Sequence, residues 1–137
     1  MNISARCEYA CRAMVELALM QQNHDPVASS VLAERRHIPE KYLVHILLQL
    51  KRAGLVQSVR GAQGGYRLGR LPEDITLLEV VQAIDGPVLD PLPVNDGQSL
   101  DLRAVWKETA DSIAGELRQI SIREVADRAA ASPMYYI

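Results

Sequence analysis

Residues 40–68 read EKYLVHILLQLKRAGLVQSVRGAQGGYRL, and this stretch decides the fold that the sequence predicts. Its first half repeats apolar residues at helical spacing, which predicts a helix over residues 40–53. The expected buried stripe of this helix consists of Tyr42, Leu43, Ile46, Leu47 and Leu50. Gly54 stands at the position after a helix where glycine is favoured, so we expect the helix to end there.

A β-hairpin is expected directly after this helix. Residues 55–60 are rich in branched side chains and have the length of a strand, and residues 66–68 can form the returning strand. The loop between them contains Gly61, Gly64 and Gly65, but it lacks the Gly-Lys-Ser/Thr of a phosphate-binding loop. Basic residues on both sides of the loop favour a nucleic-acid-binding wing, at 55–69, over a plain hairpin turn.

Capping residues and apolar periodicity predict further helices on both sides. These helices are expected to begin at the N-caps Ser4, Ser29 or Ser30, Thr76, Ser99 and Ser121, and to run to about residues 20, 36, 84, 120 and 130. Thr76 and Glu79 form a T-x-x-E capping box, as do Ser121 and Glu124. Three prolines in residues 87–98 predict a loop.

Three helices followed by a hairpin is the layout of a winged helix-turn-helix, so the predicted fold is mainly α with a small β-hairpin and a long C-terminal helix. The 137 residues fit one domain, or a small domain with an oligomerisation element. No apolar run approaches the roughly 18 residues that span a membrane, and the first 20 residues lack a signal-peptide core. Only two cysteines occur, which suits a reducing cytoplasm.

The charge is distributed unevenly along the chain. The formal net charge is −2, yet residues 35–70 carry eight basic side chains and one acid, a local charge of +7. The other residues carry seven basic and sixteen acidic side chains, a charge of −9. A basic segment of one sign that coincides with the predicted third helix and wing indicates a surface for a polyanion.

Duplex DNA fits this layout, because a helix fills the major groove and a wing lies along the phosphate backbone. The outer face of helix 40–53 is expected to read bases, while arginines of the wing pair with phosphates. The predicted DNA-binding residues are Ser29, Lys41, Val44, His45, Gln49, Arg52, Arg60, Gln63, Gly64 and Arg67. No catalytic constellation stands out, so an enzyme is not expected.

Several short motifs in order resemble one family over nearly the whole chain. They are Tyr9-Ala10-x-Arg12, Lys41-Tyr42-Leu43, LKRAGLV at 50–56, Ser58-Val59-Arg60-Gly61, GGYRL at 64–68, Ile75-Thr76, Gly86-Pro87 and Val105-Trp106. The chain thereby resembles the Rrf-two (Rrf2) family of bacterial transcription regulators, the IscR/NsrR/CymR type. The resemblance implies a winged-helix homodimer whose reading positions match Lys41, Val44 and His45, with Arg60 at the wing. We interpret the chain as a repressor.

The loop at 86–98 departs from the cluster-bearing members of that family. Those members hold an iron–sulfur cluster with three cysteines of this loop, and here it contains none. Because cluster iron requires thiolate ligands, we expect no cofactor at the usual site.

Cys7, Glu8 and Cys11 keep a metal or redox role open. Glu8 matches a position that supplies a carboxylate ligand in some cluster-bearing members, and the two cysteines lie one helical turn apart. A structural role is the favoured interpretation, since cysteine commonly packs as a small apolar residue. An iron–sulfur cluster or another metal at these residues is the alternative.

The last long helix is expected to pair two subunits. Its apolar stripe consists of Leu102, Trp106, Thr109, Ile113, Leu117 and Ile120, with Val105 beside it. The predicted organisation is a winged-helix DNA-binding domain at 1–85, an effector-type loop at 86–98, and a segment at 99–137 that comprises the dimerisation helix, a short helix and the tail. Pairing of the subunits is expected of residues 99–120. A regulatory protein or a small-molecule effector is expected to bind near the loop, and an adaptor controlled by a docked protein is the alternative.

Overall fold

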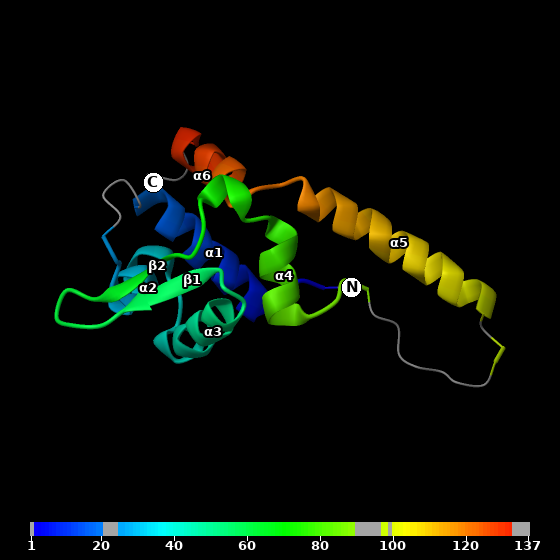
Figure 1. Cartoon of the computed structure of the whole chain (residues 1–137), viewed down its shortest axis with the longest axis horizontal. Helices are drawn as coiled ribbons and strands as arrows, with labels where there is room; N and C mark the ends of the chain where they lie inside the picture. Colours follow the sequence, from blue (N-terminus) through cyan, green and yellow to red (C-terminus); the bar gives the residue numbers. More distant parts are fainter. Residues whose placement is uncertain (1, 21–24, 90–96, 99, 133–137) are drawn as a thin grey trace.

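The computed structural model describes residues 2–20, 25–89, 97–98 and 100–132. Ser99, the expected N-cap of the long helix, most of the proline-rich loop and the last five residues lie outside the described residues. The described part is mainly helical with one antiparallel hairpin, as the sequence predicts (Figure 1).

The first three helices form the core of a helix-turn-helix. They are α1 at Ala5–Met20, α2 at Ser29–Arg36 and α3 at Glu40–Arg52. Ser4 caps α1 as expected, because its hydroxyl accepts a 3.0 Å hydrogen bond from the backbone N–H of Cys7. The expected serine cap of α2 is wrong: the N-cap is Ala28, whose side chain has no polar atom, and Ser29 is the first residue of the helix.

The hairpin consists of β1 at Val56–Val59 and β2 at Gly65–Leu68, paired antiparallel with Val56 opposite Leu68. It is joined to the helices by a short bridge, since Val27 and Tyr66 exchange two backbone hydrogen bonds of 2.8 Å. The wing is therefore anchored to the segment that enters α2.

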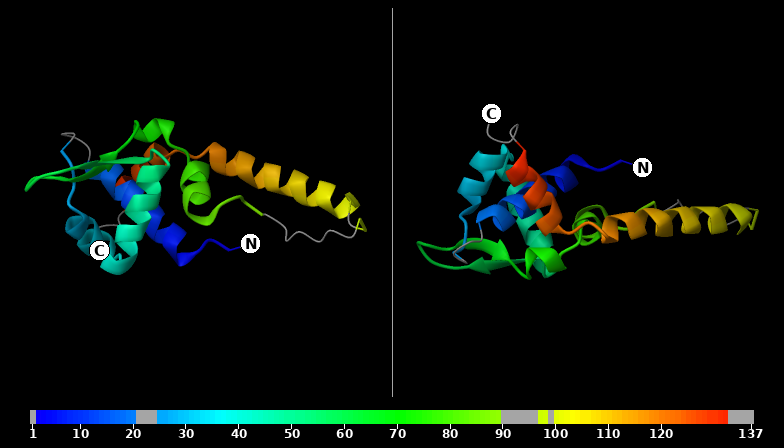
Figure 2. Two further views of the ribbon diagram at one scale, coloured as in Figure 1. Left: turned by 60° about the horizontal axis from the view of Figure 1, so that its bottom comes forward. Right: turned by 90° about the horizontal axis from the view of Figure 1, so that it is seen from above.

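Three helices follow the wing. After a short 3-10 turn, η2 at Pro72–Asp74, come α4 at Leu77–Asp85, α5 at Leu100–Arg118 and α6 at Ile122–Ala131. Thr76 and Glu79 form the predicted capping box at α4, and Ser121 accepts a hydrogen bond from the backbone N–H of Glu124 at α6. In both views of Figure 2, α5 extends as an arm beyond the rest of the fold.

The main core surrounds α1, which packs against α2, α3, α4 and α6. On α3 the residues Leu43, Ile46, Leu47 and Leu50 are buried as the stripe predicts. Tyr42 is the exception, since its side chain is 39% exposed. The periodicity places Tyr42 at the edge of the stripe, where α1 covers it only in part.

Helix α6 packs back on the helices of the winged domain. Ile122 and Ala126 are fully buried in the main core, and α6 packs against α1. The chain therefore returns to the winged domain after the arm.

Candidate nucleic-acid interface

The turn between α2 and α3 fixes the angle at which α3 is presented. His37 adopts the left-handed conformation, with φ of 52°, and Pro39 is the N-cap of α3. The backbone N–H of Ile38 returns to the carbonyl of Ala33 at 2.9 Å, which closes the end of α2. Proline at this position suits a helix start, because it lacks the N–H that a first turn leaves without an acceptor.

The two faces of α3 have opposite environments. The inner face packs in the core, while Val44 is 63% exposed and Leu48 is 43% exposed on the outer face. Lys41, His45 and Arg52 lie on the same outer side and are exposed. An outer face with cations and apolar groups suits a major groove, where phosphates, base edges and thymine methyl groups are within reach. The sequence therefore predicted the exposed face of α3 correctly. That its side chains contact bases stays a prediction.

The wing presents its cations from exposed positions. Arg60 and Gln63 are exposed in the loop at 60–64. Arg67, on β2, donates from Nε to Oε1 of Gln57 at 3.2 Å, across the two paired strands. Figure 1 shows α3 beside the wing, below the hairpin in this view.

Two glycines of the wing are required by the protein's own backbone. A Cβ atom on Gly64 would lie 2.1 Å from the carbonyl oxygen of Val59, and one on Gly65 would lie 2.3 Å from that of Val27. Gly64 is also among the residues that the sequence predicts to bind DNA. The structure gives a sufficient internal reason, so contact of Gly64 with DNA stays a prediction.

Three of the eight basic residues in the +7 segment pair with acidic side chains of the described chain. Arg35 and Arg36 pair with the buried Glu16 of α1, with Nε to carboxylate distances of 2.7 and 3.3 Å. Arg70 pairs with Glu79 of α4. The other five, Lys41, Lys51, Arg52, Arg60 and Arg67, lie on α3 and the wing. The basic residues of this segment that do not pair with an acid in the described part of the chain therefore lie on the predicted interface.

The ion pair between Arg70 and Glu79 affects the pKa of the Glu79 carboxyl group. Burial acts to raise the pKa of its carboxyl group, but the hydrogen bonds from Arg70 and from the Thr76 backbone N–H outweigh it, so the pKa is lowered.

Glu16 was missed by the sequence analysis. It is fully buried and joins α1 to α2 through the two arginines. A single acid within an apolar helix face, followed by two adjacent arginines near the end of the next helix, is the signal that could have found it.

Helix α1 lies antiparallel along the side of α3. Arg6 donates from Nη2 to Oε1 of Gln49 near the C-terminal end of α3, and the rings of Tyr9 and Tyr42 stack at 6.1 Å near its N-terminal end. Lys41 covers the outer side of Tyr42, with Nζ 5.0 Å from the ring centroid. The contribution of Arg6 to this surface was also missed, because only the tertiary structure brings it beside α3.

The two cysteines form part of a second core cluster, between α1, α4 and α5. Cys7 is fully buried with Leu78, Val81 and Val88, and Cys11 is half-buried beside them. A hydrogen bond with Cys11, burial and the carboxylate of Asp85 raise the pKa of the Cys7 thiol, so it stays protonated. The hydrogen bond from Cys7 lowers the pKa of Cys11.

Glu8 is directed elsewhere. It is exposed and pairs with Arg12 at 3.3 Å. Among the described residues, no group of three or more His, Cys, Asp and Glu side chains could hold a metal ion. A cluster with three loop thiolates does not fit this chain, whose only cysteines are Cys7 and Cys11. A site shared between two subunits stays a prediction.

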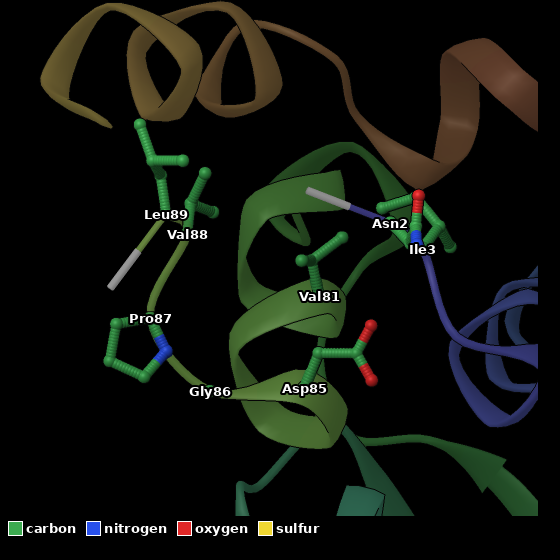
Figure 3. A pocket seen from close by; sticks show the side chains of 8 residues that line it. All are labelled: Asn2, Ile3, Val81, Asp85, Gly86, Pro87, Val88 and Leu89. Carbon is green, nitrogen blue, oxygen red and sulfur yellow. The ribbon is translucent and has the colours of Figure 1, made fainter. Parts of the chain in front are cut away.

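A cavity of about 310 Å³ lies beside the start of the proline-rich loop (Figure 3). Val81 and Asp85 of α4 form one wall, and Ile3, Val88 and Leu89 line the rest with Asn2, Gly86 and Pro87. Asp85 accepts hydrogen bonds from the backbone N–H and the hydroxyl of Ser4, at 3.2 and 2.5 Å. The volume is at the lower end of the range for small-molecule pockets.

The predicted dimerisation stripe divides into two parts. Leu102, Val105 and Trp106 are 43–50% exposed on the first half of α5. Ile113 and Leu117 are half-buried against the cluster that contains Cys7. Thr109 is exposed, and its hydroxyl donates a hydrogen bond to the carbonyl of Val105. Ile120 follows the end of α5, and its carbonyl accepts a hydrogen bond from the backbone N–H of Leu77. Only the first half of the stripe is therefore open in one protomer.

A helix-turn-helix with an outward-facing third helix and an anchored basic wing defines a winged-helix DNA-binding protein. Residues 3–128 match the family described as Rrf2, iron-dependent transcriptional regulator. The chain belongs to the Rrf2 family and is a DNA-binding transcription regulator rather than an enzyme. The resemblance found in the sequence is thus confirmed. No described helix has the length and hydropathy to cross a membrane.

Characterised relatives and solved structures agree with this assignment. The HTH-type transcriptional regulator CymR of Bacillus subtilis is 31% identical to this chain over 140 residues, and the match covers the full length of both proteins. IscR of Photorhabdus laumondii is 33% identical over 132 residues, which is 93% of this chain and 80% of the relative.

The structure of B. subtilis CymR, described as the global cysteine regulator, has a TM-score of 0.79 at 29% identity and covers 93% of this chain and 98% of that one. The structure of T. potens IscR has a TM-score of 0.75 at 31% identity, with 100% and 97% covered. Both are similar in fold to this chain over nearly their whole length.

Proposed function

We propose that the protein is a homodimeric repressor that reads its operator with α3 in the major groove and holds the backbone with the wing. The observation that carries the proposal is the outer face of α3, which leaves Lys41, Val44 and His45 exposed beside the cations of the wing. Side chains near the start of a recognition helix reach base edges, whereas arginines on a wing meet phosphates.

The exposed apolar face of α5 supports the proposed dimer. An arm that extends from the fold with Leu102, Val105 and Trp106 open to solvent requires a partner for stability, and a second copy presents the same face. Two recognition helices would then be held at the separation of one duplex turn. With DNA as its partner, the protein would act in the cytoplasm.

The experiment that tests base reading is selection from a synthetic duplex library with a randomised centre. The wild type should enrich a two-fold symmetric site. Lys41→Ala and His45→Ala should each lose about 1–3 kcal/mol of preference at one base pair per half-site. Arg60→Ala should weaken binding to all sequences and lower the slope of log affinity against log salt by about 0.9. Equal weakening on every sequence by the α3 variants would contradict the reading role.

The effector is proposed to be a small molecule that enters the cavity next to Asp85. The carboxylate gives the apolar cavity one charged wall, which suits a ligand with an amino or hydroxyl donor. Repression would be relieved if the ligand shifted α4 against α5, because these helices pack together there.

A metal or redox sensor that uses Cys7, Cys11 and Glu8 is the second candidate, favoured by the hydrogen-bonded thiols at the junction of the winged domain and the arm. Anaerobic purification with an absorption spectrum and metal analysis separates the two. We expect colourless protein, and a Cys7→Ser, Cys11→Ser variant that binds DNA like the wild type with or without oxidant. Coloured or metal-loaded protein would indicate that the thiols, rather than the cavity, are the sensing site.

A further inference from the structure

Gln49 lies on the side of α3 that the proposed function assigns to base reading, and this inference rests on that function. Its amide is already engaged by another helix, since Arg6 of α1 donates to the Oε1 atom of Gln49. A guanidinium carries only donors, so the bond fixes which atom of the amide faces Arg6. Arg6 takes one lone pair of the oxygen and places a positive charge beside it, while the Nε2 group keeps two N–H donors for another molecule.

This engagement changes what Gln49 can recognise. A glutamine with a free amide reads adenine in a bidentate manner, because it accepts from the adenine N6 amino group and donates to N7. With Arg6 at Oε1, a second donor must approach an oxygen that already faces a cation, which is unfavourable for an amino group. Guanine presents two acceptors in the major groove, N7 and O6, and both suit the Nε2 donors.

We propose that Arg6 is a specificity-determining residue, which makes Gln49 a donor-only reader and selects guanine over adenine at the base pair that Gln49 faces. Arg6 acts through Gln49 and is therefore a positioning residue.

The packing of α1 against α3 keeps Arg6 in place. One turn further along α1, Tyr9 stacks on Tyr42 with an interplanar angle of 23°. Another turn along, Arg12 donates to the carbonyl of Arg36 at the end of α2. These contacts on successive turns fix the register of α1 beside α3, so the guanidinium meets Gln49 before DNA arrives.

The test is selection from the randomised duplex library with the full-length wild type and the variants Arg6→Ala, Arg6→Lys, Gln49→Ala and the double variant Arg6→Ala, Gln49→Ala. We expect guanine at one position per half-site for the wild type. Arg6→Ala should shift that position toward adenine by about tenfold, and Arg6→Lys should retain guanine because lysine keeps a cationic donor. Gln49→Ala should lose preference there, and the double variant should match it.

Several results would overturn the inference. These are an Arg6→Ala site identical to that of the wild type, uniform weakening by Arg6→Ala with no change of base, and a Gln49→Ala site that keeps its preference. Lys41→Ala and His45→Ala are analysed in parallel. If one of these results is found while Lys41→Ala and His45→Ala still change the preferred base at their own positions, only the inference on Arg6 fails. If no variant changes a preferred base, the proposed function fails as well. Circular dichroism confirms that each variant is folded.

Discussion

Replacing Glu16 with glutamine is expected to destabilise the protein through loss of one buried charge. Its side chain is fully buried, with Arg35 at 2.7 Å and Arg36 at 3.3 Å. Removal of one partner from a fully buried pair costs about 3–5 kcal/mol. Here the Arg35 side chain is 54% exposed and regains water when the carboxylate is lost, which reduces the penalty. Glutamine also keeps one acceptor oxygen. A loss of about 2 kcal/mol follows, within the range for hydrogen bonds to charged groups.

The measurement is urea unfolding followed by circular dichroism, at one fixed protomer concentration because dimerisation also contributes to stability. Glu8→Gln provides the matched control on the same helix. Glu8 is exposed and pairs with Arg12 over one turn, so its loss should cost less than about 1 kcal/mol. Two results would refute the reasoning: a Glu16→Gln variant within 0.5 kcal/mol of the wild type, on the order of the scatter of surface changes, or equal losses in both variants.

Two further predictions concern assembly and pH. Trp106→Asp should yield folded monomers by light scattering, because the side chain is exposed in one protomer and the new charge would be buried only in a dimer. Lys107→Asp, also exposed on the same helix, should remain dimeric, and a dimeric Trp106→Asp variant contradicts the proposed seam. Glu79, whose pKa is lowered in the folded state, adds stability that is present above the pKa of the unfolded chain and is lost as the pH falls through the folded value. Glu79→Gln should therefore flatten the decline of unfolding free energy below about pH 4.3, where an unperturbed glutamate titrates, and a decline equal to that of the wild type would exclude this contribution.

The local structure of this protein could be predicted from the sequence. The stripe of Leu43, Ile46, Leu47 and Leu50 determined the inner face of α3, because apolar spacing of three and four places residues on one side of a helix. The capping box of Thr76 and Glu79 fixed the start of α4 for an equally local reason. The position of the wing and of its exposed arginines followed from short strands and glycines within a few residues of each other.

The exceptions occur where distant segments meet. Tyr42 belongs to the apolar pattern of α3 but lies half outside the core, since the extent of burial depends on how far α1 reaches over it. Ser29 was expected as a cap, yet the α2 boundary is set one residue earlier, where the segment is anchored to the wing by Val27.

Only the tertiary structure decided which charges and which faces remain available. Glu16 and Arg6 lie in one continuous helix of the sequence, and nothing local shows that the first engages α2 while the second engages Gln49 of α3. The apolar stripe of α5 is continuous in sequence, but α4 and the Cys7 cluster cover its second half and leave the first half open. The physical reason is common to all of these cases: periodicity reports which residues share a face of one helix, and the partner of that face is set by chain segments tens of residues away.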